Sequence, residues 1–526
     1  MEVLAGVAAS AWSYFSDNSN LPLSSLFSTR SSGNANVTAL VEKLSANAQV
    51  LLPGSDRYED ATMRWSVLAA PAVSFVVVVA TEEDVAQTVS NIACHWGTNN
   101  SVALYKQLGQ IRNHEKLPYL AVNGGHGAIL TQGRMKNGIE IWLNKLNTVE
   151  LAKDGKTATI GGGTLSKTVT DTLWKAGKQT VTGCCECTSI LGPGLGGGHG
   201  FLQGRYGLVS DQFVSMRMVN ADGNLISISK KTHPDLWWAM QGAGHNFGIV
   251  TSVKLKIYDI VHKTWAYQSF IYTGDKVEGL YHAINEELLK NGTQSVDILN
   301  YSFFFNSPGL DPEKAIIMFY IAQEGAAAVD SIYTKPFEDL GTVVTGKGSG
   351  DYTQLAAWTG NANDSPPCQK AGLANIRFPI DLDTYSIEAQ RAAYDLFAKG
   401  TKETPAFANS LFLFEGYSTQ GVKAIDSDST AFAFRANNLL VSPLITYQRD
   451  GSAALDKQAA GFGESLRQVL HRGSGRKEMH TYVNYAYGDE SLKNLYGYED
   501  WRQKKLKSLK GTYDPHGRFN FYAPIA

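Results

Sequence analysis

The chain has 526 residues, of which 43% are hydrophobic and 18% are charged, and its formal net charge is -2. This length predicts two or more domains, because a single hydrophobic core stops growing beyond about 250–300 residues. The balanced charge, without a Lys/Arg-rich cluster, argues against nucleic acid as a partner. No stretch of about 18 uncharged apolar residues is present, so the sequence predicts no membrane span.

The N-terminal region, residues 1–60, is predicted to pack on the domain that follows it. Residues 1–15, "MEVLAGVAASAWSYF", are mildly apolar but include Glu2 and lack the basic start of a secretory signal. The compartment is left open, with the secretory pathway as one alternative. In "NVTALVEKLSANAQVLLPG", Asn36 is predicted to cap an amphipathic helix.

Residues 61–260 alternate short strands and helices with glycine turns. The segment "SFVVVVATEEDVAQTVSNIACHW" predicts a strand and then a helix, with Thr81 as the N-cap and an acidic first turn. Residues 95–117 resemble an insertion ahead of a strand at Tyr119. The alternating segment "GIVTSVKLKIYDI" closes the region as a strand.

Residues 261–475 have fewer glycine turns and longer strands. "DILNYSFFFNS" and "KAIIMFYIAQ" alternate with helical segments such as "SIEAQRAAYDLFAKG". This pattern is typical of an antiparallel sheet backed by helices, so the predicted fold class is α+β. Residues 476–526 are aromatic and basic.

Five cysteines occur, and three of them lie in "TGCCECTSILGPGLGGGHG", residues 182–200. An odd number of cysteines does not support a disulfide scaffold, and a bridge between neighbouring cysteines fails on backbone geometry. A metal site is not favoured either, because no second ligand pair accompanies Cys184, Cys185 and Cys187. We therefore expect no metal.

Glycine runs follow three strands within eighty residues, at 123–127, 161–163 and 192–200, and a fourth run begins at residue 241. Glycine lets backbone N–H groups approach a diphosphate, because no Cβ intervenes. The letters "GPGLGG" also match the GxGxxG pattern, which alone is a weak signal, and a turn chosen for close strand packing remains the alternative. Several loops that converge from separate strands suit a long dinucleotide.

Four motifs resemble the berberine-bridge-enzyme-like branch of the vanillyl-alcohol-oxidase flavoproteins, and in particular its fungal secondary-metabolism members. They are "VNGGHG" at 122, the cysteine ahead of "GGGHG", "DLWWAMQGAGHNFGIVT" at 235, and "YVNY" at 482 with "YDPHGRF" at 513. The resemblance covers residues 60–260 and 476–526. It implies a two-subdomain FAD-binding domain of the PCMH type over 61–260, a substrate-binding domain over 261–475, and a C-terminal segment, 476–526, that returns to the FAD domain.

By this resemblance, His126 bonds the flavin 8α-methyl and Cys185 bonds flavin C6, with Cys184 and Cys187 as alternatives and a histidine-only linkage also open. A cysteine beside the electron-poor ring is expected to gain thiolate character. Val122-Asn123 stands where relatives have Arg-Ser. The residues implied to bind FAD are Asn123, Gly124, Gly125, Gly127, Ala128, Gly192, Gly196, Gly197, Gly198, Gly248, Val250, Tyr482 and Asn484.

Tyr482 matches the tyrosine that serves as base in many relatives, and Asn484 would bond the cofactor. A tyrosine, whose pKa is ordinarily near 10, needs a nearby cation or acid partner for that role; a packed strand aromatic is the alternative. His199 and His245 are read as turn residues rather than catalytic ones. Thr188 takes the position of a gate for oxygen, since a small β-branched side chain there resembles oxidases.

The resemblance implies an FAD-dependent oxidase that acts on a small organic substrate, such as a secondary metabolite or an alcohol. Dioxygen would be the acceptor and hydrogen peroxide the product. Two alternatives stay open, a carbohydrate oxidase and a non-redox cyclase or isomerase on the same fold. The sequence does not identify the substrate, because the pocket is built by the least alignable domain.

Overall fold

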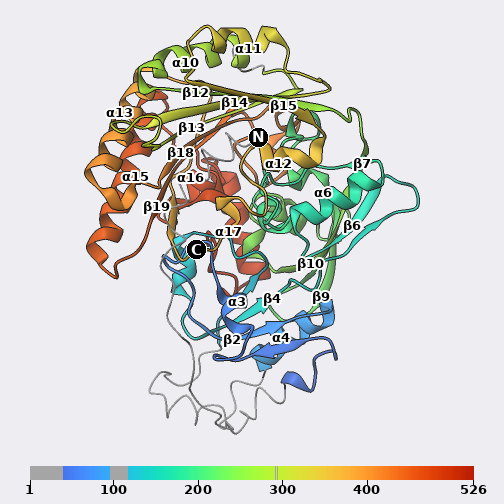
Figure 1. Ribbon diagram of the computed structural model, residues 1–526. Helices are drawn as coiled ribbons and strands as arrows, with labels where there is room; N and C mark the ends of the chain where they lie inside the picture. Colours follow the sequence, from blue (N-terminus) through green and yellow to red (C-terminus); the bar gives the residue numbers. More distant parts are fainter. Residues whose placement is uncertain (1–39, 95–116, 291, 293, 526) are drawn as a thin grey trace.

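The computed structural model describes residues 40–94, 117–290, 292 and 294–525 (Figure 1). Three large sheets organise these residues, with four, five and eight strands, and a two-stranded ribbon joins β7 (Lys178–Gln179) to β11 (Tyr258–Asp259). The predicted cap at Asn36 and the predicted insertion up to residue 116 lie outside the described residues.

The four-stranded sheet has the order β1-β2-β4-β3, in which β2, β4 and β3 run parallel. Its strands are β1 (Gln49–Leu51), β2 (Val73–Val78), β3 (Tyr119–Val122) and β4 (Gly138–Trp142). The helix α4 (Glu82–Cys94) follows β2 and begins with a reciprocal cap: Thr81 Oγ1 accepts from Asp84 N–H at 3.1 Å, and Asp84 Oδ2 accepts from Thr81 N–H at 2.9 Å. The predicted strand and capped helix are confirmed.

The five-stranded sheet is antiparallel, with the order β5-β6-β10-β8-β9. Its strands are β5 (Val149–Leu151), β6 (Thr157–Gly161), β8 (Phe213–Val219), β9 (Leu225–Ser229) and β10 (Ile249–Lys256). Short helices lie between its strands, namely α6 (Ser166–Lys175), α7 (Leu191–Leu195), α8 (Gln203–Tyr206) and α9 (Pro234–Met240). The glycine run at 192–200 thus begins within a helix of five residues and continues into a loop.

The eight-stranded sheet is antiparallel, and helices cover one of its faces (Figure 1). Its strands are β12 (Trp265–Tyr272), β13 (Ile298–Phe305), β14 (Ile316–Glu324), β15 (Val344–Gly350), β16 (Ala374–Arg377), β17 (Ile380–Leu382), β18 (Leu411–Gly416) and β19 (Leu439–Tyr447), and the covering helices are α10 (Val277–Ala283), α11 (Ser331–Glu338), α13 (Ile387–Glu403) and α15 (Ala453–Gly473). In β13, Ile298 and Phe304 pack in the same core as these helices, whereas Leu299 and Tyr301 belong to the core of the five-stranded sheet. This alternation confirms the predicted α+β class, with an antiparallel sheet backed by helices.

The C-terminal helices α16 (Leu492–Tyr496) and α17 (Asp500–Tyr513) lead the chain back to the turn before β10. Asn246 Nδ2 donates to Tyr496 Oη and to the Ala523 carbonyl, both at 3.2 Å, and Lys510 Nζ donates to the Asn246 carbonyl at 3.0 Å. The first two sheets lie within residues 49–256 and the third within 265–447. The domain boundaries themselves stay predictions.

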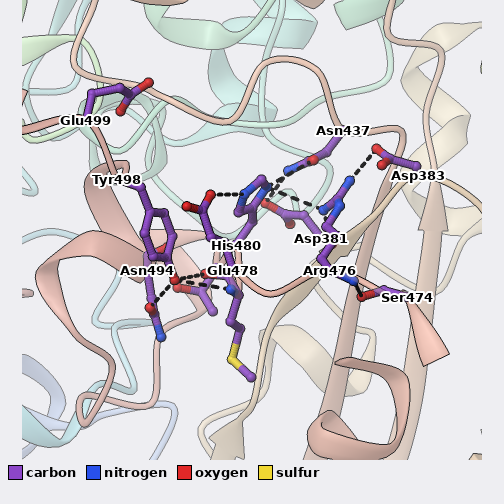
Figure 2. Close-up of polar contacts among 12 residues, drawn as sticks. Asp381, Asp383, Asn437, Ser474, Arg476, Glu478, His480, Asn494, Tyr498 and Glu499 are labelled. Carbon is purple, nitrogen blue, oxygen red and sulfur yellow. Dashed lines mark hydrogen bonds and ion pairs between the residues drawn. The ribbon is translucent and has the colours of Figure 1, made fainter. Parts of the chain in front are cut away.

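A polar network connects β17 to the chain ahead of α16, around His480 (Figure 2). Arg476 forms an ion pair with Asp383 and donates to the Asp381 carbonyl at 3.0 Å, while the Asp381 N–H donates to the His480 carbonyl at 3.0 Å. The Asp381 side chain is buried, and this burial raises its pKa to about 7.

One disulfide joins the cysteine-rich loop to the chain ahead of β16. Cys187 and Cys368, which are 181 residues apart, are bonded with a Cα–Cα distance of 5.6 Å. The sequence prediction did not include this bridge, because the odd number of cysteines argued against a disulfide scaffold and no local spacing pairs residues so far apart. Cys184 and Cys185 are free.

None of the helices in the described ranges is long and apolar enough to cross a membrane.

Candidate active site

A cavity of about 320 Å³ takes its walls from segments next to all three sheets. The four-stranded sheet supplies β3 and the turn after it, the five-stranded sheet supplies the start of β10, and the eight-stranded sheet supplies the end of β16 and the residue after β18. The lining includes these residues singled out in the sequence: Asn123, Gly124, Gly125, His126, Gly127, Ala128, Cys185, Thr188, Gly192, Gly248, Val250, Tyr482 and Asn484. Segments that are more than 350 residues apart in sequence therefore meet at one site.

Three glycines expected to bind the cofactor, Gly196, Gly197 and Gly198, are not among the lining residues. A Cβ on Gly196 would lie 2.3 Å from Asn484 Oδ1, and a Cβ on Gly197 would lie 2.5 Å from the Phe432 ring. Gly197 and Gly198 also have positive φ angles of 104° and 85°. These contacts favour the alternative that the sequence left open, in which the glycines serve backbone conformation and close packing behind the wall; their role in binding FAD stays a prediction.

His126 stands on the turn that follows β3 and lines the cavity. Its ring stacks on Trp65 with centroids 6.3 Å apart, and the Trp65 N–H donates to the Gly125 carbonyl at 3.1 Å. Burial, with the Lys370 charge nearby, lowers the pKa of His126 to about 4, so the imidazole is neutral at ordinary pH. Its Nδ1 is buried and has no hydrogen-bond partner among the described residues. In the tautomer that carries the proton on Nε2, Nδ1 has a free lone pair and is a nucleophile.

The three clustered cysteines differ in their surroundings. The Cys185 thiol donates to Asn361 Oδ1 at 3.3 Å, and Cys184 Sγ lies 3.1 Å from Tyr417 Oη and 3.3 Å from Tyr301 Oη. Cys185 and Cys184 both line the cavity, whereas Cys187 is held in the disulfide. Burial raises the pKa of Cys185 to about 11, although the charge of Arg377 acts to lower it. The thiolate character expected from the sequence is therefore not produced by the protein residues around Cys185.

Tyr482 is 4% exposed and lies at the cavity wall. Its hydroxyl oxygen accepts hydrogen bonds from Asn484 Nδ2 at 2.7 Å and from the His199 backbone N–H at 3.3 Å. Burial raises its pKa well above the usual range. Neither donor is a cation, so the partner that a tyrosine base would require is not supplied by these two contacts.

Glu415, which was not predicted from the sequence, forms a second acid–base group with Tyr417 and Tyr485. It lies in β18 with both oxygens occupied: Tyr417 Oη donates to Oε2 at 2.6 Å and Tyr485 Oη donates to Oε1 at 3.0 Å. Tyr417 and Tyr485 line the cavity, and Glu415 lies behind them. Burial raises the pKa of Glu415, while both tyrosines and Arg377 lower it. The signal was present in the sequence, because Glu415 is the only charged residue in the strand "LFLFEG".

Arg377, at the end of β16, completes this wall. Its guanidinium lies 4.0 Å from the centre of the Tyr485 ring and 5.4 Å from the Trp65 ring. The Nη1 atom is buried and has no partner in the part of the chain that the structure describes.

His199 and His245, read from the sequence as turn residues, both line the cavity. His199 Nδ1 lies 2.9 Å from Gln203 Oε1, and burial lowers its pKa to about 4. His245 Nε2 lies 2.8 Å from the Gly192 carbonyl, which leaves its buried Nδ1 without a partner among the described residues.

The wall fits FAD, the cofactor implied by the sequence. His126 Nδ1, His245 Nδ1 and Asn484 Oδ1 are buried polar atoms at the wall that lack a partner in the described ranges. Buried polar groups are normally satisfied, so such a set indicates a polar ligand. The glycines of the 124–127 turn bring the backbone close to the space, as a dinucleotide requires.

Comparison with known proteins supports FAD as the cofactor. A family model described as an FAD binding domain matches residues 106–229. The FAD-linked oxidoreductase chyH of Penicillium rubens is 50% identical over 526 residues, which is 100% of both chains. The FAD-linked oxidoreductase chry5 of Gibberella zeae is 51% identical over 488 residues, 93% of this chain and 94% of that one.

Among solved structures, the BBE-like 1 protein of Physcomitrella patens aligns with a TM-score of 0.74 at 19% identity, covering 93% of this chain and 99% of its own. The glucooligosaccharide oxidase of Acremonium strictum aligns with a TM-score of 0.74 at 17% identity, covering 94% and 100%. These likenesses show the fold. The chain therefore belongs to the fungal FAD-linked oxidoreductases, enzymes that use FAD, and it has the fold of the berberine-bridge-enzyme-like oxidases.

Proposed function

We propose that this oxidoreductase is an oxidase that acts on a small organic substrate, a secondary metabolite or an alcohol, with dioxygen as acceptor and hydrogen peroxide as product. The observation that carries the proposal is the meeting of His126, Cys185 and Tyr482 at one cavity. Bound FAD supplies the hydride acceptor. The residues of the chain hold it, orient the substrate and move the proton.

FAD is held in this proposal by two covalent bonds, through His126 Nδ1 and Cys185 Sγ. The glucooligosaccharide oxidase with this fold is described as carrying a 6-S-cysteinyl, 8α-N1-histidyl FAD. His126 supports the same role, because its ring is neutral and its Nδ1 has no hydrogen-bond partner among the described residues. Cys185 is favoured over Cys187, whose sulfur is used by the disulfide, and over Cys184, whose thiol lies against Tyr301 and Tyr417.

Tyr482 and the Tyr417–Glu415 pair divide the proton chemistry. The Tyr482 oxygen already accepts two N–H bonds, so its own proton is free to orient a substrate oxygen. Tyr417 donates its proton to Glu415, so its oxygen can accept a substrate proton while the carboxylate takes the one it releases. A carboxyl group ionises at far lower pH than a tyrosine hydroxyl, so Glu415 is available as the final proton acceptor at a pH where tyrosine is still protonated.

The wall around this chemistry is aromatic, with Trp65, Tyr417, Tyr482, Tyr485 and Tyr522 in the lining. Aromatic walls with a few placed polar groups suit a flat, largely apolar molecule. This composition favours a secondary metabolite over a sugar, although several proteins with this fold are named as carbohydrate oxidases.

Anaerobic mixing tests the function. A substrate should bleach the yellow protein without oxygen, and admission of air should restore the colour and release one hydrogen peroxide per flavin. If product forms and the colour never changes, the enzyme is a cyclase or an isomerase. If the colour bleaches and air does not restore it, the enzyme is a dehydrogenase with another acceptor.

A further inference from the structure

The segment 361–370 lies between α12 (Leu355–Trp358) and β16, yet it is bound to the cysteine-rich loop of the cofactor side. We call it the clamp segment. The Glu186 N–H donates to the Asn361 carbonyl at 3.0 Å, and the Asn363 N–H donates to Glu186 Oε2 at 2.9 Å. The Cys187–Cys368 disulfide closes the same contact covalently.

At its first residue the clamp segment contacts the proposed cysteine link. Asn361 Oδ1 accepts the hydrogen bond from the Cys185 thiol at 3.3 Å. The amide cannot turn over freely, because Asn361 Nδ2 donates to the carbonyl of Thr359 at 3.1 Å and to its Oγ1 at 3.0 Å. Asn361 therefore fixes the direction in which Cys185 Sγ is presented.

Near its far end the clamp segment reaches the proposed histidine link through Cys187, the disulfide partner of Cys368. Cys187 Sγ lies 3.4 Å from His126 Nε2. A disulfide sulfur has no hydrogen, so only a protonated Nε2 gains from this contact, and the lone pair is then on Nδ1. Lys370 Nζ also lies 3.3 Å from where a Cβ on Gly125 would stand, so the segment packs directly on the turn that holds His126.

We propose that the clamp segment, closed by the Cys187–Cys368 disulfide, positions both side chains that attach to the flavin. Asn361 positions Cys185, and the disulfide positions His126. The inference rests on the proposed covalent attachment. Each attachment replaces a C–H bond of the flavin by a C–N or C–S bond; two protons leave, one from carbon and one from the imidazole or thiol, and the electron pair left on the flavin passes to dioxygen.

The disulfide also removes a competing nucleophile. A reduced Cys187 would place a thiol 3.4 Å from His126, two residues from Cys185. Holding this sulfur in a disulfide leaves Cys185 and Cys184 as the free thiols at the cavity.

The test compares full-length wild type, the double variant Cys187→Ser/Cys368→Ser, and Asn361→Leu, with Asp364→Ala as a matched control in an exposed part of the same segment. Each is incubated with FAD, and flavin is measured as total bound and as flavin retained on each peptide after denaturation. A displacement of reacting atoms by about 1 Å costs on the order of 100-fold in rate.

In the double variant we expect FAD to bind while attachment at both residues slows by about 10- to 100-fold. In Asn361→Leu, which keeps the disulfide, we expect slow attachment at Cys185 and normal attachment at His126. The control should match wild type.

Wild-type attachment rates in either variant would overturn the inference. If the double variant does not fold, Asn361→Leu decides alone. Flavin that is wholly released from wild type would instead refute the covalent attachment itself.

Discussion

In the proposed function, Tyr482 orients the substrate, whereas Glu415 receives the substrate proton through Tyr417. The two residues therefore predict different phenotypes. Tyr482→Phe removes one hydroxyl and keeps the ring. Because this hydroxyl is proposed to orient the substrate, we expect flavin reduction to slow by roughly 10²–10⁴-fold at every pH, measured anaerobically by stopped flow. A rate near that of wild type would remove Tyr482 from the chemistry.

Glu415→Gln is the paired variant. Burial raises the pKa of Glu415, so the wild-type rate should rise with pH as this carboxyl ionises, and the Gln variant should be slow without that rise. The same pH profile in wild type and Glu415→Gln would assign the titrating group to another residue.

Thr188 tests the access of oxygen. It lines the cavity, and its hydroxyl donates to the Cys185 carbonyl at 3.0 Å, so its position is fixed relative to the proposed link. Thr188→Leu adds bulk, and we expect slower reoxidation in air with unchanged reduction by substrate. Thr188→Val is the control, because it removes the hydroxyl at nearly constant volume and should reoxidise as wild type does. Equal reoxidation rates in the Leu variant and wild type would show that oxygen enters elsewhere.

At the scale of elements, the junction of β17 with the C-terminal segment contains a carboxyl that opposes stability near neutral pH. Burial raises the pKa of Asp381 from 3.8 to about 7, so the folded protein retains this proton between about pH 4 and pH 7 while the unfolded chain loses it. The contribution of this group to the free energy of unfolding is therefore full below about pH 4 and is lost as the pH rises from about 4 to about 7.

Asp381→Asn removes this titration. We expect the variant to gain stability over wild type as pH rises from 4 to 8, by at most about 4 kcal/mol, since each pKa unit corresponds to about 1.36 kcal/mol. Thermal unfolding midpoints across this pH range measure it. The control is Asp364→Asn, at an exposed position outside this network, and it should show no such trend. A constant difference between variant and wild type would contradict the raised pKa of Asp381.

The elements that the sequence predicted well are those with strong local signals. The cap at Thr81 and the apolar run of β2 predict a strand and a helix within residues 73–94. The alternation in β13 and β14 sets the faces of the third sheet, because side chains along a strand point to opposite sides.

What the sequence did not predict depends on contacts over long separations. Cys187 and Cys368 are 181 residues apart, and no local pattern pairs them. The close approach of Gly196 to Asn484, where a Cβ would lie 2.3 Å from Oδ1, is not visible in a glycine motif. Glu415 was detectable as a charge in an apolar strand, but its partners Tyr417 and Tyr485 are identified only by the fold.

At the scale of the whole molecule, three sheets bring turns from distant parts of the chain to one cavity, and this assembly is the basis of the proposed activity. His126 comes from the first sheet, Cys185 from the loop ahead of α7, and the proton-handling residues from β18 and the C-terminal segment. The central claim is that His126 and Cys185 hold FAD covalently in this cavity.

Mapping of the flavin on the denatured protein tests this claim most directly. After acid precipitation and digestion, fragmentation of the yellow peptides should place flavin on both His126 and Cys185. Cys185→Ala should retain the histidine bond alone, His126→Ala should retain at most the cysteine bond, and Cys184→Ala, the matched control, should retain both. Flavin found entirely in the supernatant of wild type would contradict the account, as would flavin bonded to Cys184 in place of Cys185.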